Sequence, residues 1–288
     1  METFLEHVKN GLSQQPKKLS SRFFYDSRGD ELFQQIMRHE AYYLPASELQ
    51  IIQTKSRLIA KDISAVHKAI QVVELGAGDG SKTKYFLKQL KPFFDTLDYN
   101  ALDISNNILN ENREQIEPFV KGLQWSGIPG NYFRTYKTIA PGKKGRLVLF
   151  LGANVGNYTK EGALELFEFI KSQLRPNDFI LMSFDLVKNP RKIIKAYDDN
   201  QGITKAFNLN LLERMNSELG ANFEVSAFDH FPFYNPMSGL TSSQLISLKK
   251  QTVRFSEGFE VHFDAYEAIH TEISKKYRIS EIDALAEE

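Results

Sequence analysis

The residues best placed to do chemistry form a glycine-rich turn, ELGAGDG, at positions 74–80. Glycine lets a backbone turn tightly and approach a ligand where any Cβ would clash. A β-branched run precedes the turn, and we expect a helix to begin at Lys82 with Ser81 as its cap, so that free N–H groups face an anionic ligand group. Because position 81 is Ser, the spacing is G-x-G-x-G rather than the G-x-G-x-x-G typical of dinucleotide binding. The turn alone allows either a nucleoside-type site or an incidental strand–turn–helix.

Two later features favour the nucleoside site. Asp103 ends the second predicted strand, where a carboxylate can accept both ribose hydroxyls of an adenosine. After the third predicted strand, the Asn131 amide could pair with the adenine edge, and Tyr132 could stack beside it. An exposed strand-end acid and a plain turn are the alternatives for these features taken singly. With Glu74 heading it, the turn resembles the first motif of class I S-adenosylmethionine (SAM) methyltransferases, and the three features in this order predict SAM binding.

Strand and helix signals alternate from about residue 70 to residue 187. This alternation predicts an α/β fold of Rossmann-like type, with a mainly parallel sheet and helices on both faces. The expected strands span residues 71–75, 99–104, 123–126, 146–151 and 179–184. The expected helices between them span residues 82–90, 106–117 and 161–174.

The flanking regions have different patterns. Residues 1–65 predict helices and loops, with one helix at about 46–64. Later helices are expected near 191–197 and 209–219, the second with Asn208 as a possible cap, and antiparallel stretches at 223–231, 244–255 and 259–263. We therefore expect a SAM-binding core of residues 66–187, completed by about 264–288. Residues 1–65 and 188–263 would form a second, substrate-binding lobe that covers the strand ends, where open α/β sheets bind ligands.

Composition limits the possible functions. The 288 residues carry 36 Lys and Arg against 36 Asp and Glu, so nothing suggests a surface for nucleic acid or an anionic membrane. Without cysteine there is no disulfide framework and no thiolate chemistry. The six histidines show no metal-ligand spacing, so no metal is expected. The amino terminus lacks a secretory pattern and no apolar run approaches the ~18 residues of a membrane span, which predicts a cytoplasmic enzyme.

Several long motifs make the chain similar to a known family. They are FYDSRGDELF at 24–33, EAYY at 40–43, FLGANVGNYT at 150–159, DLVK at 185–188, AYDD at 196–199 and TEIS at 271–274. From about residue 19 to 280, the chain resembles the SAM-dependent histidine Nα-methyltransferases of ergothioneine biosynthesis. The resemblance implies transfer of up to three methyl groups from SAM to the α-amine of L-histidine, with S-adenosylhomocysteine (SAH) as the second product.

The resemblance also implies roles for individual residues. Those that stand where the family contacts SAM are Gly76, Gly78, Lys82, Asp103, Asn131 and Tyr132. Those that stand where it holds histidine are Tyr42, Gly152, Asn157, Tyr197, Ser243, Glu272 and Ser274. Tyr25 and Asn157 would position the substrate amine, and no residue stands out as a general base. Glu272 and Ser274, two apart on a predicted strand, would share one face and could hydrogen-bond both imidazole nitrogens.

Three features depart from the family's pattern. The family commonly has an acid where Asn131 stands, although an amide can still accept from the adenine amino group. Ser242 and Ser243 replace a Glu-Met pair, which would leave a roomier and more polar side-chain pocket. The chain stops at Glu288, short of a family tail that forms a strand hairpin. We therefore expect an open sheet edge, with self-association or a partner that covers it.

Two other functions stay open. The same chemistry could act on another amino acid or amine, such as a tryptophan derivative, and Ser243 motivates this alternative. The chain could also be a SAM-binding subunit without catalysis. The presence of Tyr42, Asn157, Tyr197 and Glu272 together argues against that second alternative.

Overall fold

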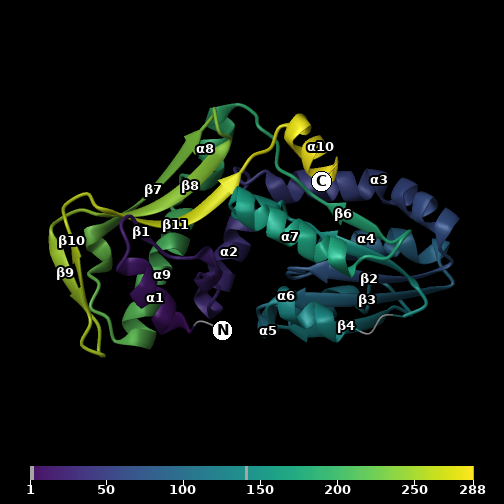
Figure 1. The fold of residues 1–288 in the computed structure, drawn as a ribbon, viewed down its shortest axis with the longest axis horizontal. Helices are drawn as coiled ribbons and strands as arrows, with labels where there is room; N and C mark the ends of the chain where they lie inside the picture. Colours follow the sequence, from purple (N-terminus) through teal and green to yellow (C-terminus); the bar gives the residue numbers. More distant parts are fainter. Residues whose placement is uncertain (1–2, 140–141, 288) are drawn as a thin grey trace. The chain divides into compact units, whose positions relative to one another are not determined.

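Residues 3–139 and 142–287 are described by the computed structural model, and they divide into two units. The central unit comprises residues 44–185, and the terminal unit comprises residues 1–43 together with 186–288. Each unit has its own sheet (Figure 1). Each also has its own hydrophobic core.

A five-stranded parallel sheet forms the middle of the central unit, in the order β4-β3-β2-β5-β6. The strands are β2 Ala69–Leu75, β3 Thr96–Asp103, β4 Gln124–Pro129, β5 Gly145–Phe150 and β6 Phe179–Met182. Strand β5 is buried throughout, as expected for a parallel strand covered on both faces. The strand order reverses between β2 and β5, and open α/β sheets bind ligands at the carboxyl ends of strands at such a point.

Helices cover both faces of this sheet. They are α3 Leu44–Val66, α4 Thr83–Leu90, α5 Asn106–Ile116, α6 Tyr132–Thr135 and α7 Lys160–Gln173. Helices α3, α4 and α5 share one core cluster with strand residues that include Leu149. Phe150, the next residue of β5, points to the opposite face, where its ring centroid lies 6.1 Å from that of Tyr132. Phe133 of α6 and Phe169 of α7 lie 4.9 Å apart on the same face.

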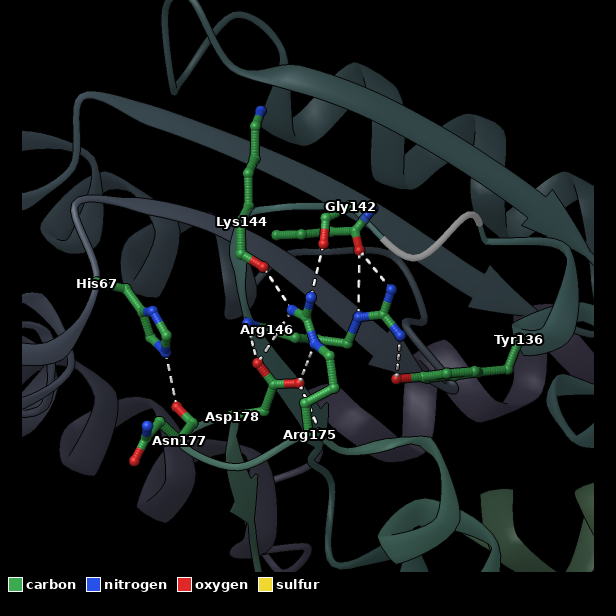
Figure 2. Close-up of polar contacts among 9 residues, drawn as sticks. His67, Tyr136, Gly142, Lys144, Arg146, Arg175, Asn177 and Asp178 are labelled. Atoms are coloured by element: carbon green, nitrogen blue, oxygen red, sulfur yellow. Dashed lines mark hydrogen bonds and ion pairs between the residues drawn. The ribbon is translucent and has the colours of Figure 1, made fainter.

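A polar network fixes the strand starts at the other end of the sheet (Figure 2). Arg146 of β5 donates to Gln71 Oε1 of β2 at 2.8 Å and to the Tyr136 hydroxyl at 3.2 Å. Asp178, just before β6, accepts the Arg146 amide at 2.8 Å and Arg175 Nε at 3.1 Å (Figure 2). These contacts hold β2, β5 and β6 together at their amino ends, opposite the carboxyl ends at which open α/β sheets bind ligands.

A four-stranded sheet forms the middle of the terminal unit, in the order β1-β11-β8-β7. Strands β7 Phe228–Asn235, β8 Leu240–Ser247 and β11 Ala268–Lys275 pair antiparallel, and β1 Lys17–Lys18 adds parallel to β11. A separate hairpin joins β9 Gln251–Arg254 to β10 Glu260–Phe263. Buried and partly exposed residues alternate strictly along β8, so one face of this sheet points into a core.

The helices of the terminal unit are α1 Phe4–Leu12, α2 Ser27–Arg38, α8 Pro190–Tyr197, α9 Ile203–Leu219 and α10 Ile279–Glu287. One core cluster joins α1, α2 and α9 to the sheet and to the β9–β10 hairpin, through residues such as Leu211, Leu245 and Val261. A smaller cluster joins α8 to β7, with Tyr197 and Tyr234 as its largest buried members.

The expected strands and helices of the parallel sheet are confirmed, with ends that move by no more than three residues. The division into units differs from the expected one. Residues 264–288 do not complete the parallel sheet, because β11 pairs with β8 and β1 in the terminal unit. Its alternating pattern suits a sheet with one covered face, whereas strands of a parallel sheet are buried on both. The helix expected at 46–64 belongs to the central unit as α3.

Two predicted helix caps are wrong. Ser81 donates its hydroxyl to Asp79 Oδ1 at 2.7 Å, and α4 begins at Thr83 without a side-chain cap. Asn208 lies inside α9 and donates to the Thr204 carbonyl at 3.0 Å, because that helix already begins at Ile203. In both cases the side chain makes a local hydrogen bond that competes with capping.

Candidate active site

The glycine-rich turn lies at the carboxyl end of β2, beside the end of β3. Gly76 and Gly78 have φ of +70° and +56°, a left-handed backbone that favours glycine. Their amides donate to the Leu102 carbonyl at 2.8 Å and to Asp103 Oδ2 at 2.9 Å, which ties the turn to β3. A Cβ built on Gly78 would meet no atom within 4 Å. The turn therefore borders open space, where a ligand can come close to the backbone.

Asn112 of α5 supports the turn from its other side, and sequence reasoning missed this residue. Its side chain donates to the Gly78 carbonyl at 2.9 Å and accepts from Trp125 Nε1 at 3.0 Å. A Cβ on Gly80 would lie 2.9 Å from Asn112 Nδ2, so the third glycine makes room for α5 and not for a ligand. The sequence does give a signal for Asn112, because it is a polar residue on the apolar stripe of the helix predicted at 106–117.

The carboxylate of Asp103 is held at the end of β3 by two backbone amides. Oδ2 accepts from Gly78 at 2.9 Å and Oδ1 accepts from Ser105 at 3.1 Å. Burial raises the pKa of Asp103, and these amide hydrogen bonds oppose the rise. A carboxylate has about four lone-pair sites, so Asp103 keeps the capacity to accept from a ribose hydroxyl.

Asn131 and Tyr132 follow β4, the strand next to β3. The Asn131 side-chain oxygen accepts from the Phe133 amide at 2.9 Å and caps α6. That oxygen keeps a second lone pair, which could accept from an adenine amino group. The Tyr132 hydroxyl is hydrogen-bonded to that of Tyr158, and burial raises the pKa of Tyr132 far above its ordinary value. The ring is therefore neutral and held in one position.

Lys82 forms an ion pair with Glu48 of α3, and the other oxygen of Glu48 accepts from the Gly152 amide at 2.7 Å. The Lys82 and Glu48 side chains are only 19% and 11% exposed. Burial alone would raise the pKa of Glu48, but the charge and hydrogen bond of Lys82 hold it below its usual value. Glu48 thus connects Lys82 and Gly152, which are both predicted site residues. Sequence reasoning missed it because an acid near the start of a helix has an ordinary explanation in the helix dipole.

The acid that heads the motif, Glu74, has a different role from Asp103. It is buried and accepts from the Tyr99 hydroxyl at 2.6 Å and from Thr83 Oγ1 at 2.9 Å. Burial raises the pKa of Glu74 to about 8, against the lowering effect of these hydrogen bonds. Glu74 therefore joins the end of β2 to β3 and to the start of α4, inside the protein.

The loop after β5 carries Gly152 and Asn157. Gly152 and Ala153 have φ of +78° and +55°, and the left-handed conformation is unusual for alanine. The Ala153 amide donates to Ser183 Oγ at 2.9 Å, which holds this loop to the end of β6. A short 3-10 turn, Asn154–Asn157, then ends with the exposed side chain of Asn157. The loop thus presents a carboxamide at the carboxyl end of the sheet.

In the terminal unit, Glu272 and Ser274 of β11 face β8. Glu272 lies opposite Ser243 and Ser274 lies opposite Thr241, so the four side chains share one face of the sheet. Burial raises the pKa of Glu272 to about 7, against the lowering effect of the Lys276 charge. A carboxyl group with that pKa changes its charge close to neutral pH.

Tyr197, the last residue of α8, reaches the same face. Its hydroxyl donates to Ser274 Oγ at 2.8 Å. Its ring lies edge-on to Tyr42, with 6.4 Å between centroids. Tyr25 is in ring contact with Phe207 at 5.7 Å. The structure therefore brings Tyr42, Tyr197 and Ser274 together, and packs Tyr25 on α9.

Ser243 is buried, and its hydroxyl is hydrogen-bonded to His230 Nε2 of β7 at 3.1 Å. Burial lowers the pKa of His230 to about 4, so this ring is neutral at neutral pH. Position 243 is therefore polar, as expected. His230, which sequence reasoning missed, is the second polar side chain there.

Lys276 follows β11 directly and is also missing from the sequence-based set. It is fully buried, and its Nζ donates to the Tyr197 hydroxyl at 2.7 Å and to Ser274 Oγ at 2.9 Å. Its position continues the two-residue spacing of Glu272 and Ser274, and this spacing could have placed Lys276 on the same strand face.

Comparison with known proteins gives the family. Histidine-specific, SAM-dependent methyltransferases match residues 4–288. The chain belongs to this family. Histidine N-alpha-methyltransferases from Mycobacterium tuberculosis and Mycolicibacterium smegmatis are 32% and 34% identical to it, over 96% of this chain and 85% of each relative. An L-tryptophan methyltransferase from Psilocybe serbica is 26% identical, over 97% of this chain and 85% of that protein.

The chain is thus a SAM-dependent methyltransferase with the class I, Rossmann-like fold, and the order β4-β3-β2-β5-β6 agrees with it. Its central unit fits the cofactor, because open space at Gly78 adjoins a carboxylate, Asp103, with spare acceptor capacity. The residues expected to hold the substrate come from both units of the methyltransferase. Gly152 and Asn157 belong to the central unit, and the others belong to the terminal unit. Among the described residues, no helix is both long and apolar enough to cross a membrane.

Proposed function

We propose that this methyltransferase transfers methyl groups from SAM to the α-amine of L-histidine, up to the trimethyl product. The observation that carries the proposal is the pair Glu272 and Ser274 on one face of β11. A neutral imidazole has one N–H donor and one acceptor nitrogen. Glu272 can accept from the N–H, and the Ser274 hydroxyl can bond the other nitrogen. The two mycobacterial relatives, named for histidine, support the same substrate.

The cofactor is assigned to the strand ends of the central unit. When bound, SAM supplies an electrophilic methyl group on a sulfonium. The backbone at Gly76 and Gly78 would lie against it, and Asp103 would accept from the ribose hydroxyls. Lys82, held in place by its ion pair with Glu48, would offer a positive charge to the carboxylate of the cofactor. The adenine is assigned to Asn131 and Tyr132.

The amine must be placed with its lone pair on the axis of displacement, and this positioning is the main catalytic task. Asn157 and Tyr25 are assigned to it, because a carboxamide or a phenol can orient an amine without adding a competing charge. Gly152, Tyr42 and Tyr197 are assigned to the rest of the substrate backbone, and aromatic faces stabilise a methylated ammonium. An unperturbed α-amine titrates near ~8, so part of it is already neutral and no side-chain base is assigned.

A second substrate class, tryptophan or another aromatic amine, also has an observation in its favour. Ser243, opposite Glu272, is a small side chain bonded to His230, so this part of the face carries little apolar bulk. The L-tryptophan methyltransferase that is 26% identical to this chain supports this second class. Selectivity between imidazole and indole is therefore the property to measure first.

Two further parts of the proposal concern partners and location. In the described part of the central unit, β6 is an edge strand, paired only with β5, and Ile180 on it is 41% exposed. Unpaired strand edges template association, so we propose that a second copy or a partner covers β6. Sedimentation across a concentration series tests this, and a monomer at all concentrations would contradict self-association. The enzyme is proposed to work in the cytoplasm, which cell fractionation would test.

The test of function is a substrate screen with purified protein and methyl-labelled SAM, using each common amino acid. Histidine should give the highest kcat/KM, with successive mono-, di- and trimethyl products in the mass spectrum. Asp103→Ala serves as the control for cofactor-dependent signal. Turnover of tryptophan without turnover of histidine would favour the second class. SAM binding without turnover of any amine would favour a non-catalytic subunit.

A further inference from the structure

Lys276 is a fully buried cation that no step proposed above uses. Burying an ammonium group costs free energy unless it is paired and hydrogen-bonded. The backbone of Lys276 is anchored, because its amide donates to the Gly239 carbonyl at 2.7 Å in the turn between β7 and β8. Its Nζ lies 4.9 Å from the centroid of the Tyr197 ring and donates to the hydroxyls of Tyr197 and Ser274. The charge is thus held within hydrogen-bond distance of both hydroxyls.

The hydrogen bonds around Ser274 have a fixed direction. An ammonium group can only donate, so Ser274 Oγ accepts from Lys276 at 2.9 Å. Ser274 Oγ also accepts from the Tyr197 hydroxyl at 2.8 Å. A hydroxyl has two acceptor lone pairs and one hydrogen, so both lone pairs are occupied and the hydrogen remains to be donated. Ser274 can therefore act toward a ligand as a donor and not as an acceptor.

A second hydroxyl on this face, that of Thr241, also indicates a binding site. Thr241 lies opposite Ser274 and is 1% exposed. Within the described residues, its Oγ1 has no hydrogen-bond partner. Buried polar atoms almost always have a partner, so a bound molecule is expected beside Thr241 and Ser274.

We propose that Lys276 is a positioning residue for the substrate side chain, because it fixes Ser274 as a hydrogen-bond donor on the same strand face as the acceptor Glu272. The inference rests on the proposed function and deepens it. A ring suited to this arrangement offers an acceptor nitrogen to Ser274 and an N–H to Glu272. Neutral imidazole has both, whereas indole has an N–H and no acceptor nitrogen. Lys276 thus contributes to selection of histidine over tryptophan without touching the substrate.

The charge of Lys276 also supports the acceptor role of Glu272. Burial raises the pKa of Glu272 to about 7, and the nearby ammonium lowers it, which keeps part of the carboxyl ionised at neutral pH. Titratable side chains packed around this face include His230, Tyr234, Tyr197, Tyr42 and Tyr43, and the charged groups Asp229, Lys205 and Asp199 act on His230. His230 is neutral at neutral pH, since burial lowers its pKa to about 4. The charge that lowers the pKa of Glu272 is that of Lys276.

The first experiment needs no substrate. Carbon-13 NMR of protein labelled at the glutamate carboxyls follows the titration of Glu272, and Glu272→Gln assigns its signal. The midpoint should lie near 7 in the parent. Lys276→Met should raise it by about 1 unit or more, because an opposite charge is lost. Lys276→Arg keeps the charge and should leave it near the parent value, whereas an unchanged midpoint in Lys276→Met would overturn the proposal.

The second experiment separates positioning from general stability. In Lys276→Met, the KM for histidine should rise about tenfold, as expected for one lost hydrogen bond, while kcat and the KM for SAM stay within about twofold. Ser274→Ala should give the same rise with Lys276 intact. The double variant should show no further rise, because both changes remove one interaction. Effects that add in full would mean that Lys276 supports only the fold, which overturns the proposal.

The outcomes distinguish this inference from the proposed function. If the parent does not methylate histidine, the proposed function fails and the Glu272 titration still tests Lys276. If the parent methylates histidine but Lys276→Met leaves its KM and the Glu272 midpoint unchanged, the positioning role fails alone. Should Lys276→Met not fold, Ser274→Ala decides, and a histidine KM equal to that of the parent would overturn the proposal.

Discussion

Glu48 and Lys82 form an ion pair beside the glycine-rich turn of the central unit. The same carboxylate accepts from the amide of Gly152 at 2.7 Å, with its other oxygen. One side chain of α3 therefore fixes both a lysine at the start of α4 and the loop after β5. Catalysis by alignment requires such rigid support for the groups that touch the ligand.

Replacing this acid should cost both stability and cofactor affinity. Glu48→Gln keeps an acceptor for Gly152 but leaves Lys82 partly buried without its counter-charge, which should lower the free energy of unfolding by about 1–3 kcal/mol. Denaturant unfolding and calorimetry with SAH would measure the two effects. Glu117→Gln is the matched control, since it removes an exposed ion pair with Arg113. Equal losses in both variants would show that Glu48 has no special role.

Asp103 is expected to carry the ribose of SAM. Asp103→Ala removes an acceptor for the ribose hydroxyls and frees the Gly78 amide, so SAH affinity should fall by roughly 1.5–3 kcal/mol. Asp103→Asn keeps one acceptor oxygen and should lose less. Titration calorimetry of both variants would check the order. An alanine variant that binds SAH as tightly as the parent would remove Asp103 from the site.

The sequence predicts the central unit well because its signals are local. Each strand is a short apolar run, and each functional turn or acid, such as Gly76 or Asp103, follows a strand end. In the terminal unit, the expectation that residues 264–288 complete the SAM-binding core is wrong, because β11 pairs with β8 and β1. Pairing partners are set by tertiary contacts, and alternation by itself does not identify them.

The supporting residues of the site could not be predicted in the same way. Glu48 is 34 residues from Lys82 and 104 from Gly152 along the chain. His230 and Lys276 likewise act through partners that only folding brings close. A buried lysine or histidine looks like a surface residue in the sequence, because its burial depends on hydrogen bonds that the sequence does not show.

Glu74 should make stability depend on pH. Its pKa is about 8 in the folded protein, raised by burial from 4.5. The folded state therefore keeps a proton that the unfolded state releases above pH 4.5, so stability falls as pH rises from about 4.5 to 8 and levels off above that. The contribution is on the order of a few kcal/mol. Between pH 5 and pH 9, Glu74→Gln should lose less stability than the parent, while Glu111→Gln, at an exposed site, should follow the parent.

Bulk at position 243 should change substrate selectivity. Ser243→Met would add apolar volume opposite Glu272. The ratio of kcat/KM for histidine over tryptophan should therefore rise by about tenfold, which is typical of one or two added methylenes in a pocket. Ser243→Ala is the control, because it also removes the hydroxyl bound to His230 but adds no volume. Competition between the two amino acids in one reaction would measure the ratio. The same ratio in both variants would exclude a steric effect.

Glu272 should decide which side chain is accepted. Among the residues expected to hold the substrate it is the one acid, and it shares a sheet face with Ser274. Glu272→Ala leaves the imidazole N–H desolvated and unpaired, which costs about 1–3 kcal/mol, or some five- to hundredfold in kcat/KM for histidine. Turnover of tryptophan should be kept or improved, because Asn157 and Tyr197 remain.

The pH dependence gives this prediction a second, independent readout. Burial raises the pKa of Glu272 to about 7, so its acceptor form increases as pH rises through neutrality. In the parent, kcat/KM for histidine should rise through this range more steeply than kcat/KM for tryptophan. Glu272→Gln cannot titrate and should reduce the difference between the two profiles to the part that the titration of the substrate imidazole itself causes. Parallel profiles in the parent, with an equal loss on both substrates in Glu272→Ala, would mean that Glu272 only supports the fold.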